Sequence, residues 1–312
     1  MKRNIILVFV LGVIALSFSS ENNSYSKAKL GALLFNEKIL SKDSSVSCAS
    51  CHKPEHAFSD TMAFSMGIMG MPTRRNTPSV LNMKNRPYYF WDGRAQTLAE
   101  QALMPIQNPD EMGLPIEEAI NRLRNSAFYN NYFRKVFHAQ PNTDNLAAAL
   151  AAFENTLETD ECKLDRWGDN KATLTPEEER GRELFVGDKA KCFNCHLFED
   201  FTNDEFKNIG LFDGKKFNDS GRYLITKNPA DIGKFKTPGL RNIAITAPYM
   251  HNGMFATLEA VVDFYNDPRK LVPDGIGIDT SLQRPLGLTA QEKKDIVAFL
   301  RTLTDKKFET NN

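Results

Sequence analysis

The chain has 312 residues, in which 39 Lys and Arg residues balance 39 Asp and Glu residues. A net charge near zero gives no reason to expect a nucleic acid or an anionic membrane surface as a partner. The length suits one large domain or two medium ones.

The first 20 residues have the pattern of a secretory signal peptide. Lys2 and Arg3 form a short basic region, residues 5–18 are apolar and uncharged, and serines at 17, 19 and 20 surround the expected cleavage point. The apolar run is shorter than the roughly 20 residues that span a bilayer, which disfavours an uncleaved membrane anchor. We expect residues 1–20 to be removed and the mature protein to be periplasmic.

Two segments carry the pattern C-x-x-C-H: CASCH at 48–52 and CFNCH at 192–196. This pattern attaches c-type haem through two thioethers and supplies one axial histidine. Single C-x-x-C pairs also occur in redox disulfides and zinc sites. Two copies with trailing histidines in an exported chain favour two covalently bound haem c groups. The predicted attachment and axial residues are Cys48, Cys51, His52, Cys192, Cys195 and His196.

The sequence also contains an internal repeat, and its elements are predicted to be helices. Residues 77–98 align with 237–258 without a gap, 30–35 resemble 180–185, and 151–157 resemble 297–303. We therefore expect an all-α fold of two cytochrome c-like haem domains. Their predicted bounds are 24–162 and 163–312, and the fifth cysteine, Cys162, is expected to be an unpaired thiol at the boundary.

Helical patterns are clear in several segments. Thr175 and Pro176 are a typical helix start, residues 289–303 place Ile296, Phe299, Leu300 and Leu303 on one face, and residues 142–157 behave likewise. Strand signals are scarce. Four long segments with many glycines and prolines are predicted to be loops that could surround a cofactor, at 65–78, 104–116, 209–239 and 266–288.

The repeat pairs Pro105 in the first copy with Tyr265 in the second, at an offset of 160 residues. Proline has no group that binds iron, whereas tyrosine is a haem ligand type. One haem would then be open on its distal side and the other closed by Tyr265. The alternatives are that Tyr265 is only a packed aromatic residue, or that Met250 or Met254 is the ligand instead.

An open haem that activates peroxide needs a nearby acid–base group. Glu111 is the natural candidate, and the alternative is a solvated loop carboxylate. His138 precedes Pro141 and is expected to cap the end of a helix. The remaining unassigned histidines, His56 and His251, give the first haem no obvious second ligand.

The chain closely resembles the bacterial dihaem cytochrome c peroxidase family, including its MauG-like branch. The resemblance covers residues 25–305 and rests on the two haem motifs, RNTPSVLN (75–82), FWDGRAQTLAEQA (90–102), NPDEMG (108–113) and TPGLRNIAITAPYMHNG (237–253). It implies that the first haem reacts with peroxide. Glu111 and Gln101 then match the distal catalytic residues, and Trp91 matches the residue that relays electrons between the haems.

The resemblance also implies one calcium ion between the domains, at positions matching Asn76, Thr246 and Pro248, with the oxygen ligands that a hard cation prefers. Ile68 stands where typical members have a histidine that closes the first haem, so that haem is expected to be open unless Met66, Met69 or Met71 replaces the ligand. At position 265 typical members have methionine, and the MauG-like branch has tyrosine.

These observations leave three hypotheses. The first is an exported dihaem peroxidase that reduces hydrogen peroxide to water with electrons from a small donor protein, a cytochrome c or a cupredoxin, delivered through the second haem. The second is a MauG-like oxidase that modifies side chains of a partner protein. The third is a dihaem electron carrier without catalysis, which Glu111 disfavours. Family members are often homodimers, which makes a dimer an expectation of the resemblance alone.

Overall fold

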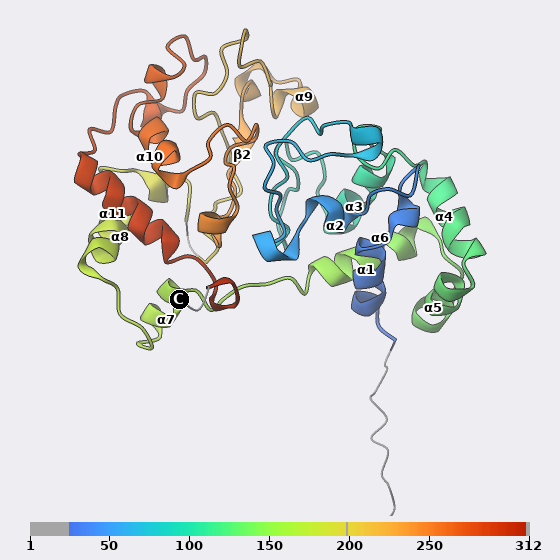
Figure 1. Ribbon diagram of the computed structural model, residues 1–312. Coiled ribbons are helices and arrows are strands. Elements are labelled where there is room, and N and C mark those ends of the chain that lie inside the picture. The colour runs from blue at the N-terminus through green and yellow to red at the C-terminus, as the bar shows by residue number, and fades with distance from the viewer. Residues whose placement is uncertain (1–24, 198, 310–312) are drawn as a thin grey trace, which may run out of the picture.

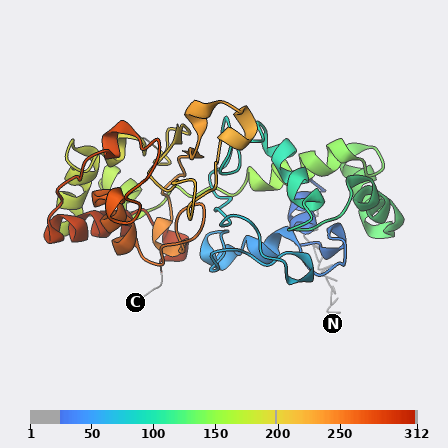
Figure 2. The same cartoon turned by 90° about the horizontal axis from the view of Figure 1, so that it is seen from above.

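The computed structural model describes residues 25–197 and 199–309, and the predicted signal peptide lies outside them. The described chain is mostly helical, as expected, and forms two lobes (Figure 1). We call residues 25–157 the first lobe and residues 163–309 the second lobe. The turned view also shows them side by side (Figure 2). No helix in the described ranges has the length and apolarity that crossing a membrane requires.

Long irregular segments connect the helices of both lobes. The helices of the first lobe are α1 (Lys27–Phe35), α2 (Cys48–Cys51), α3 (Leu98–Gln107), α4 (Ile116–Asn125), α5 (Ala127–Phe137) and α6 (Thr143–Glu154). Those of the second lobe are α7 (Lys163–Gly168), α8 (Pro176–Val186), α9 (Tyr223–Thr226), α10 (Leu258–Asn266) and α11 (Ala290–Arg301). The two short strands β1 (Phe206–Lys207) and β2 (Phe235–Lys236) pair antiparallel, with Phe206 opposite Lys236.

Each lobe has its own hydrophobic core. Helix α1 packs on α6 in the first lobe, around Leu34, Phe133 and Leu150. Helix α8 packs on α11 in the second, around Phe185 and Phe299. The apolar face predicted for residues 289–303 is confirmed, since Ile296, Phe299, Leu300 and Leu303 are all at most 6% exposed.

A glycine allows the close approach of the two helices in each lobe. A Cβ atom on Gly31 of α1 would lie 2.0 Å from the carbonyl oxygen of Ala149 in α6. A Cβ atom on Gly181 of α8 would lie 1.9 Å from the carbonyl oxygen of Asp295 in α11. Because backbone cannot yield as a flexible side chain can, both crossings depend on the missing side chain.

We expect Gly31→Ala to lower the free energy of unfolding by about 3 kcal/mol, since it forces α1 away from α6. Chemical denaturation measures the effect. Gly168→Ala is the matched control, because a Cβ atom there would have no atom within 4 Å. Equal stability of the two variants would contradict this account of the crossing.

Several predicted helix ends are confirmed. Thr175 caps α8 and accepts a hydrogen bond from the Glu178 amide, with Pro176 in the first turn. His138 ends α5 in the left-handed conformation, with φ +55°. Two predicted loops were wrong in part. Residues 104–107 are helical, so Pro105 lies inside α3, and the segment 209–239 contains the short helix α9 and strand β2. The backbone amides of Met112 and Leu114, in the loop after α3, donate hydrogen bonds to the carbonyl oxygens of Pro105 and Ile106. These bonds stabilise the last turn of α3.

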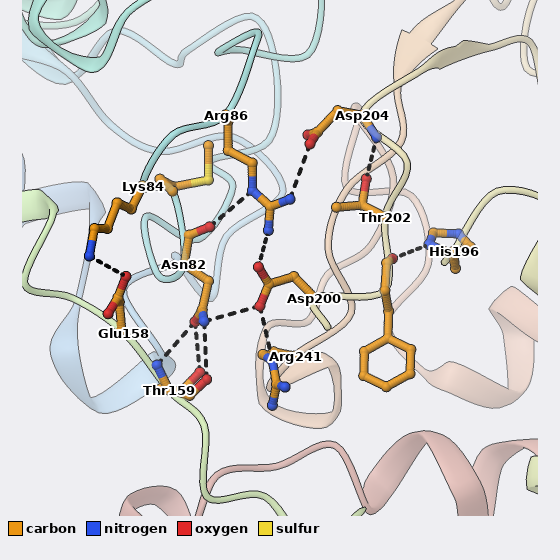
Figure 3. Close-up of polar contacts among 12 residues, drawn as sticks. Asn82, Lys84, Arg86, Glu158, Thr159, His196, Asp200, Thr202, Asp204 and Arg241 are labelled. Carbon is orange, nitrogen blue, oxygen red and sulfur yellow. Dashed lines mark hydrogen bonds and ion pairs between the residues drawn. The ribbon is translucent and has the colours of Figure 1, made fainter. Parts of the chain in front are cut away.

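A polar network joins the lobes at Asp200 (Figure 3). Its carboxylate accepts from Asn82 Nδ2 at 3.1 Å, from Arg241 Nε at 3.0 Å and from Arg86 Nη2. The Asn82 side chain also bonds Thr159 of the connecting segment. The next residue, Phe201, accepts from His196 through its carbonyl oxygen. One of the contacts between the lobes is thus one residue from the group that orients His196.

We expect Asp200→Ala to lower the free energy of unfolding by about 2 kcal/mol, because Arg86 and Arg241 lose a partner while they stay mostly buried. Thermal unfolding monitors this change. Asp169→Ala removes an exposed ion pair with Lys171 and should have an effect below about 0.5 kcal/mol. A comparable loss in both variants would rule out a special role for the network.

Candidate active site

A cavity of about 750 Å³ lies in the first lobe, within the size range of small-molecule and cofactor sites. Residues 218–219 and 224–225 of the second lobe complete its wall. Many of the residues singled out from the sequence line it: Cys48, Cys51, His52, Asn76, Trp91, Gln101, Pro105 and Glu111. Residues more than 50 positions apart in the chain therefore meet at one site.

His52 is oriented for iron ligation. Its Nδ1 donates a hydrogen bond to the carbonyl oxygen of Phe58 at 3.0 Å, which leaves Nε2 free to bind a metal. Burial lowers the pKa of His52, and the neutral ring is the form that ligates iron. His196 has the same arrangement, with Nδ1 at 2.9 Å from the carbonyl oxygen of Phe201 and a pKa lowered by burial.

The cysteine environment fits thioether attachment. All five cysteines are free thiols, so neither C-x-x-C pair is a disulfide in the structure. Burial raises the pKa of Cys48 and of Cys192 to about 12, which keeps both thiols neutral. Among residues 25–197 and 199–309, no group of three or more His, Cys, Asp or Glu side chains is arranged to hold a metal ion.

Glu111 is partly buried rather than fully solvated. Asn108 donates to its Oε1 from Nδ2 at 2.6 Å. Burial raises the pKa of Glu111, against the opposing effects of the Asn108 hydrogen bond and the Arg94 charge. The raised pKa makes the carboxyl easier to protonate near neutral pH, as an acid–base group requires.

A neighbouring loop holds the Glu111 turn in place. The Ile68 amide donates to the Glu111 carbonyl oxygen at 2.8 Å, and a Cβ atom on Gly67 would lie 2.2 Å from the Asp110 carbonyl oxygen. The Ile68 side chain is buried and lies against Gly113, and it does not line the cavity. The loop methionines are exposed and do not line the cavity either: Met66, Met69 and Met71.

Helix α3 presents Gln101 and Pro105 to the cavity, one turn apart. Proline offers no ligand atom, and the side chain of Gln101 makes no hydrogen bond with the rest of the described chain. Two other methionines, Met83 and Met112, line the wall and also pack in hydrophobic clusters. The wall near α3 is thus formed by an unpartnered amide, an apolar ring and the Glu111 carboxyl.

Trp91 lies between the cavity and the second lobe. It lines the large cavity and also a smaller one of about 100 Å³, whose wall includes Lys236 and Pro238. Its Nε1 donates to the Asn76 carbonyl oxygen at 2.9 Å, and its own carbonyl oxygen accepts from the Lys236 amide at 2.8 Å. A tryptophan whose ring nitrogen and main chain are both hydrogen-bonded in this position is suited to an electron relay.

Tyr265 lies on α10 near the second C-x-x-C-H motif. Burial raises the pKa of its hydroxyl, and the charges of Cys195 and Cys192 act in the same direction. The hydroxyl makes no hydrogen bond with any other described residue. Met250 and Met254 pack in the same cluster as Tyr265, so either methionine remains an alternative candidate for the ligand of the second haem. An oxygen atom near the second pair of cysteines is nevertheless free to act as a ligand.

The positions matched to calcium supply oxygen atoms. No hydrogen bond in the described chain uses Asn76 Oδ1 or the carbonyl oxygens of Thr246 and Pro248, whereas Asn76 Nδ2 donates to Met62 and Ala63. Amide and carbonyl oxygens suit a hard cation. His251 is not part of this set, because its ring stacks on Phe235 with centroids 3.7 Å apart.

Sequence reasoning missed several residues of the cavity, among them Asn108 and Glu154. Asn108, the hydrogen-bond donor to Glu111, lies in the NPDEMG motif and could have been found there. Glu154, near the end of α6, lines the cavity with a buried carboxyl. The available signal was the repeat, which places Leu300 opposite Glu154 in the second copy.

Fold and site together define a mostly helical protein with two c-type haem attachment sequences, one of which faces a large cavity with a buried carboxyl. The family model described as di-haem cytochrome c peroxidase matches residues 25–173. The chain belongs to this family. Membership implies two haem groups and makes the protein an oxidoreductase.

Relatives of both branches are similar to the chain. The methylamine utilization protein MauG of Methylorubrum extorquens is 38% identical over 283 residues, which are 89% of this chain and 78% of the relative. The cytochrome c551 peroxidase of Nitrosomonas europaea is 36% identical over 282 residues, 89% and 79% of the two chains.

Solved structures share the fold. A MauG-like protein associated with microbial copper homeostasis superimposes with a TM-score of 0.83 at 35% identity, covering 90% of each chain. The diheme peroxidase BthA of Burkholderia thailandensis superimposes with a TM-score of 0.81 at 28% identity, covering 90% of this chain and 86% of the other.

Proposed function

We propose that the protein is a dihaem peroxidase that reduces hydrogen peroxide to water at the first haem, with electrons delivered through the second. The observation that carries the proposal is the 750 Å³ cavity, which His52 shares with Glu111, Gln101 and the ligand-free Pro105. A pure electron carrier has no use for an acid–base group in the wall of a cavity that could admit peroxide.

Each of these residues has a distinct role in the proposed reaction. Cys48 and Cys51 would hold the first haem by thioethers and His52 would ligate its iron, and the haem would supply the redox chemistry with peroxide. Glu111 takes a proton from one peroxide oxygen and returns it to the leaving oxygen. The unpartnered Gln101 amide orients peroxide. Cys192, Cys195 and His196 would hold the second haem and Tyr265 would ligate it, and Trp91 would lie on the path of electrons between the two sites.

A second candidate function is oxidation of side chains in a partner protein, as the MauG-like branch suggests. Tyr265 favours it, because an anionic oxygen ligand stabilises oxidised haem and suits a site that shares oxidising equivalents. A high-potential donor would reduce such a haem less readily. The partner in the first case is a small cytochrome c or cupredoxin, and in the second a protein substrate.

Several further features belong to the proposal. We infer two haem domains that arose by duplication, with bounds 24–162 and 163–312. Paired details support this: Gly31 and Gly181 at the helix crossings, and the bridges Tyr89–Ala95 and Tyr249–Phe255. We also propose that one calcium ion binds at Asn76, Thr246 and Pro248. The mature protein would be periplasmic after loss of residues 1–20, and it would form a homodimer.

Two measurements test the proposed function: the electron paramagnetic resonance spectrum of the oxidised protein and its turnover with peroxide. Electron paramagnetic resonance of the purified holoprotein should show one high-spin and one low-spin ferric haem, and reduced cytochrome c should be oxidised upon addition of peroxide. Two low-spin haems without turnover would refute an enzyme. An open high-spin haem that consumes peroxide but accepts no electrons from cytochrome c or a cupredoxin would favour the oxidase.

A further inference from the structure

Glu154 carries one of two buried side-chain polar atoms in the described chain that have no hydrogen-bond partner, the other being Thr237 Oγ1. The residue lies at the end of α6, is 5% exposed, and lines the 750 Å³ cavity. Its Oε2 is the unpartnered atom. A buried polar atom without a partner costs about 1–3 kcal/mol, so packing alone gives no reason for a carboxyl here.

The second lobe shows that the helix packing does not need this carboxyl. Residues 151–157 align with 297–303, which places Leu300 opposite Glu154. Leu300 is 6% exposed and packs in the core of the second lobe. Helices α6 and α11 each pack on a glycine-containing helix. The carboxyl therefore distinguishes the cavity of the first lobe from the corresponding place in the second.

Among residues 25–197 and 199–309, no cation compensates the charge of Glu154. Burial alone raises its pKa to about 8. The titratable groups that interact with it are Cys48, which the haem would consume, and Tyr89, whose hydroxyl donates to the Met83 carbonyl oxygen. The charged residues on α1, α3 and α4, the other helices that contact α6, are exposed or bonded elsewhere: Lys27, Lys29, Glu100, Glu117, Glu118, Arg122 and Arg124.

We propose that Glu154 is the redox-linked proton acceptor of the first haem site, binding a proton when an electron enters that site and releasing it when the electron leaves. This inference rests on the proposed function, because it requires haem at Cys48 and Cys51. A protein donor or an electrode supplies the electron, which reduces ferric to ferrous iron. Solvent supplies the proton, which forms an O–H bond on the carboxylate. The net charge of the site then stays constant.

The physical reason is the low dielectric around the carboxyl. Reduction removes one positive charge from the site, and a nearby buried carboxylate then binds protons more tightly. Between its pKa values in the oxidised and reduced protein, electron and proton arrive together. In this window a tenfold change in proton concentration shifts the potential of the first haem by about 59 mV.

Two measurements on the holoprotein test the proposal. Potentiometric titrations at several pH values give the reduction potential of the first haem, and infrared difference spectra between the oxidised and reduced protein report the carboxyl group. In the wild type, the potential of the first haem should fall as pH rises, and reduction should produce a protonated-carboxyl band that shifts in D₂O. Glu154→Gln keeps the shape, and Glu154→Leu copies the second lobe. Both should lose the band and the pH dependence. Glu158→Gln, four residues further on and exposed, should lose neither.

Retention of the band and the slope in both Glu154 variants would overturn the proposal. Loss in Glu154→Leu but not in Glu154→Gln would also overturn it, because a change in packing would then be the cause. Glu111 is the other carboxyl of the cavity, so the band must survive in Glu111→Gln. Haem content is measured first: absence of haem at Cys48 and Cys51 refutes the proposed function, whereas a normally loaded protein without the band refutes only the role of Glu154.

Discussion

Replacing Glu111 with glutamine is expected to slow the reaction with peroxide by about 100-fold or more, while the haem content stays unchanged. In the wild-type protein, Asn108 Nδ2 donates to Glu111 Oε1 at 2.6 Å. Glutamine has the same shape, and its side-chain oxygen still accepts this hydrogen bond. It cannot carry a proton between the two peroxide oxygens. Stopped-flow absorption after mixing with peroxide measures the rate.

The dependence of this rate on pH separates proton transfer from a change in cavity shape. Burial raises the pKa of Glu111, and the carboxylate must be ionised to accept a proton. The wild-type rate should therefore fall as the pH decreases through this raised pKa, and the profile of Glu111→Gln should be flat. Glu117→Gln, on the exposed face of α4, is the control with wild-type behaviour. A fast, pH-dependent Glu111→Gln variant would contradict the assigned role.

Replacing Tyr265 with phenylalanine is expected to change the spectrum of the second haem and raise its reduction potential by roughly 100 mV, since axial ligands tune haem potentials over about 0.8 V. The variant removes only the hydroxyl, which makes no hydrogen bond in the described chain. Packing against Phe264 and Val272 should persist. Resonance Raman spectra and a potentiometric titration measure both changes.

The matched control is Tyr223→Phe, which removes a hydroxyl from α9 in the same lobe. Its spectrum should equal that of the wild type. An unaltered spectrum in Tyr265→Phe would instead assign the ligand to Met250 or Met254, the methionines in the same cluster. Substitution of each methionine by leucine then identifies which one binds the iron.

Local sequence patterns predicted much of the helical structure. Thr175 and Pro176 begin α8 because a hydroxyl cap and a proline at the first turn satisfy or remove free amide groups. The end of α3 was predicted wrongly for a related reason. Pro105 usually interrupts a helix, but here the loop after α3 donates hydrogen bonds to Pro105 and Ile106 and keeps the last turn helical.

The sequence by itself determined the haem motifs and the helical class, because these depend on residue types at short spacing. It also predicted a repeat from matches far apart in the chain, and its resemblance to the family singled out Glu111 as the candidate acid–base group. The tertiary structure decided what surrounds them. It bonds the partly buried Glu111 to Asn108, turns Ile68 away from the cavity, and places Glu154 in the cavity wall with Oε2 unpartnered. Desolvation and hydrogen bonding arise from residues distant in the chain, and no local pattern records them.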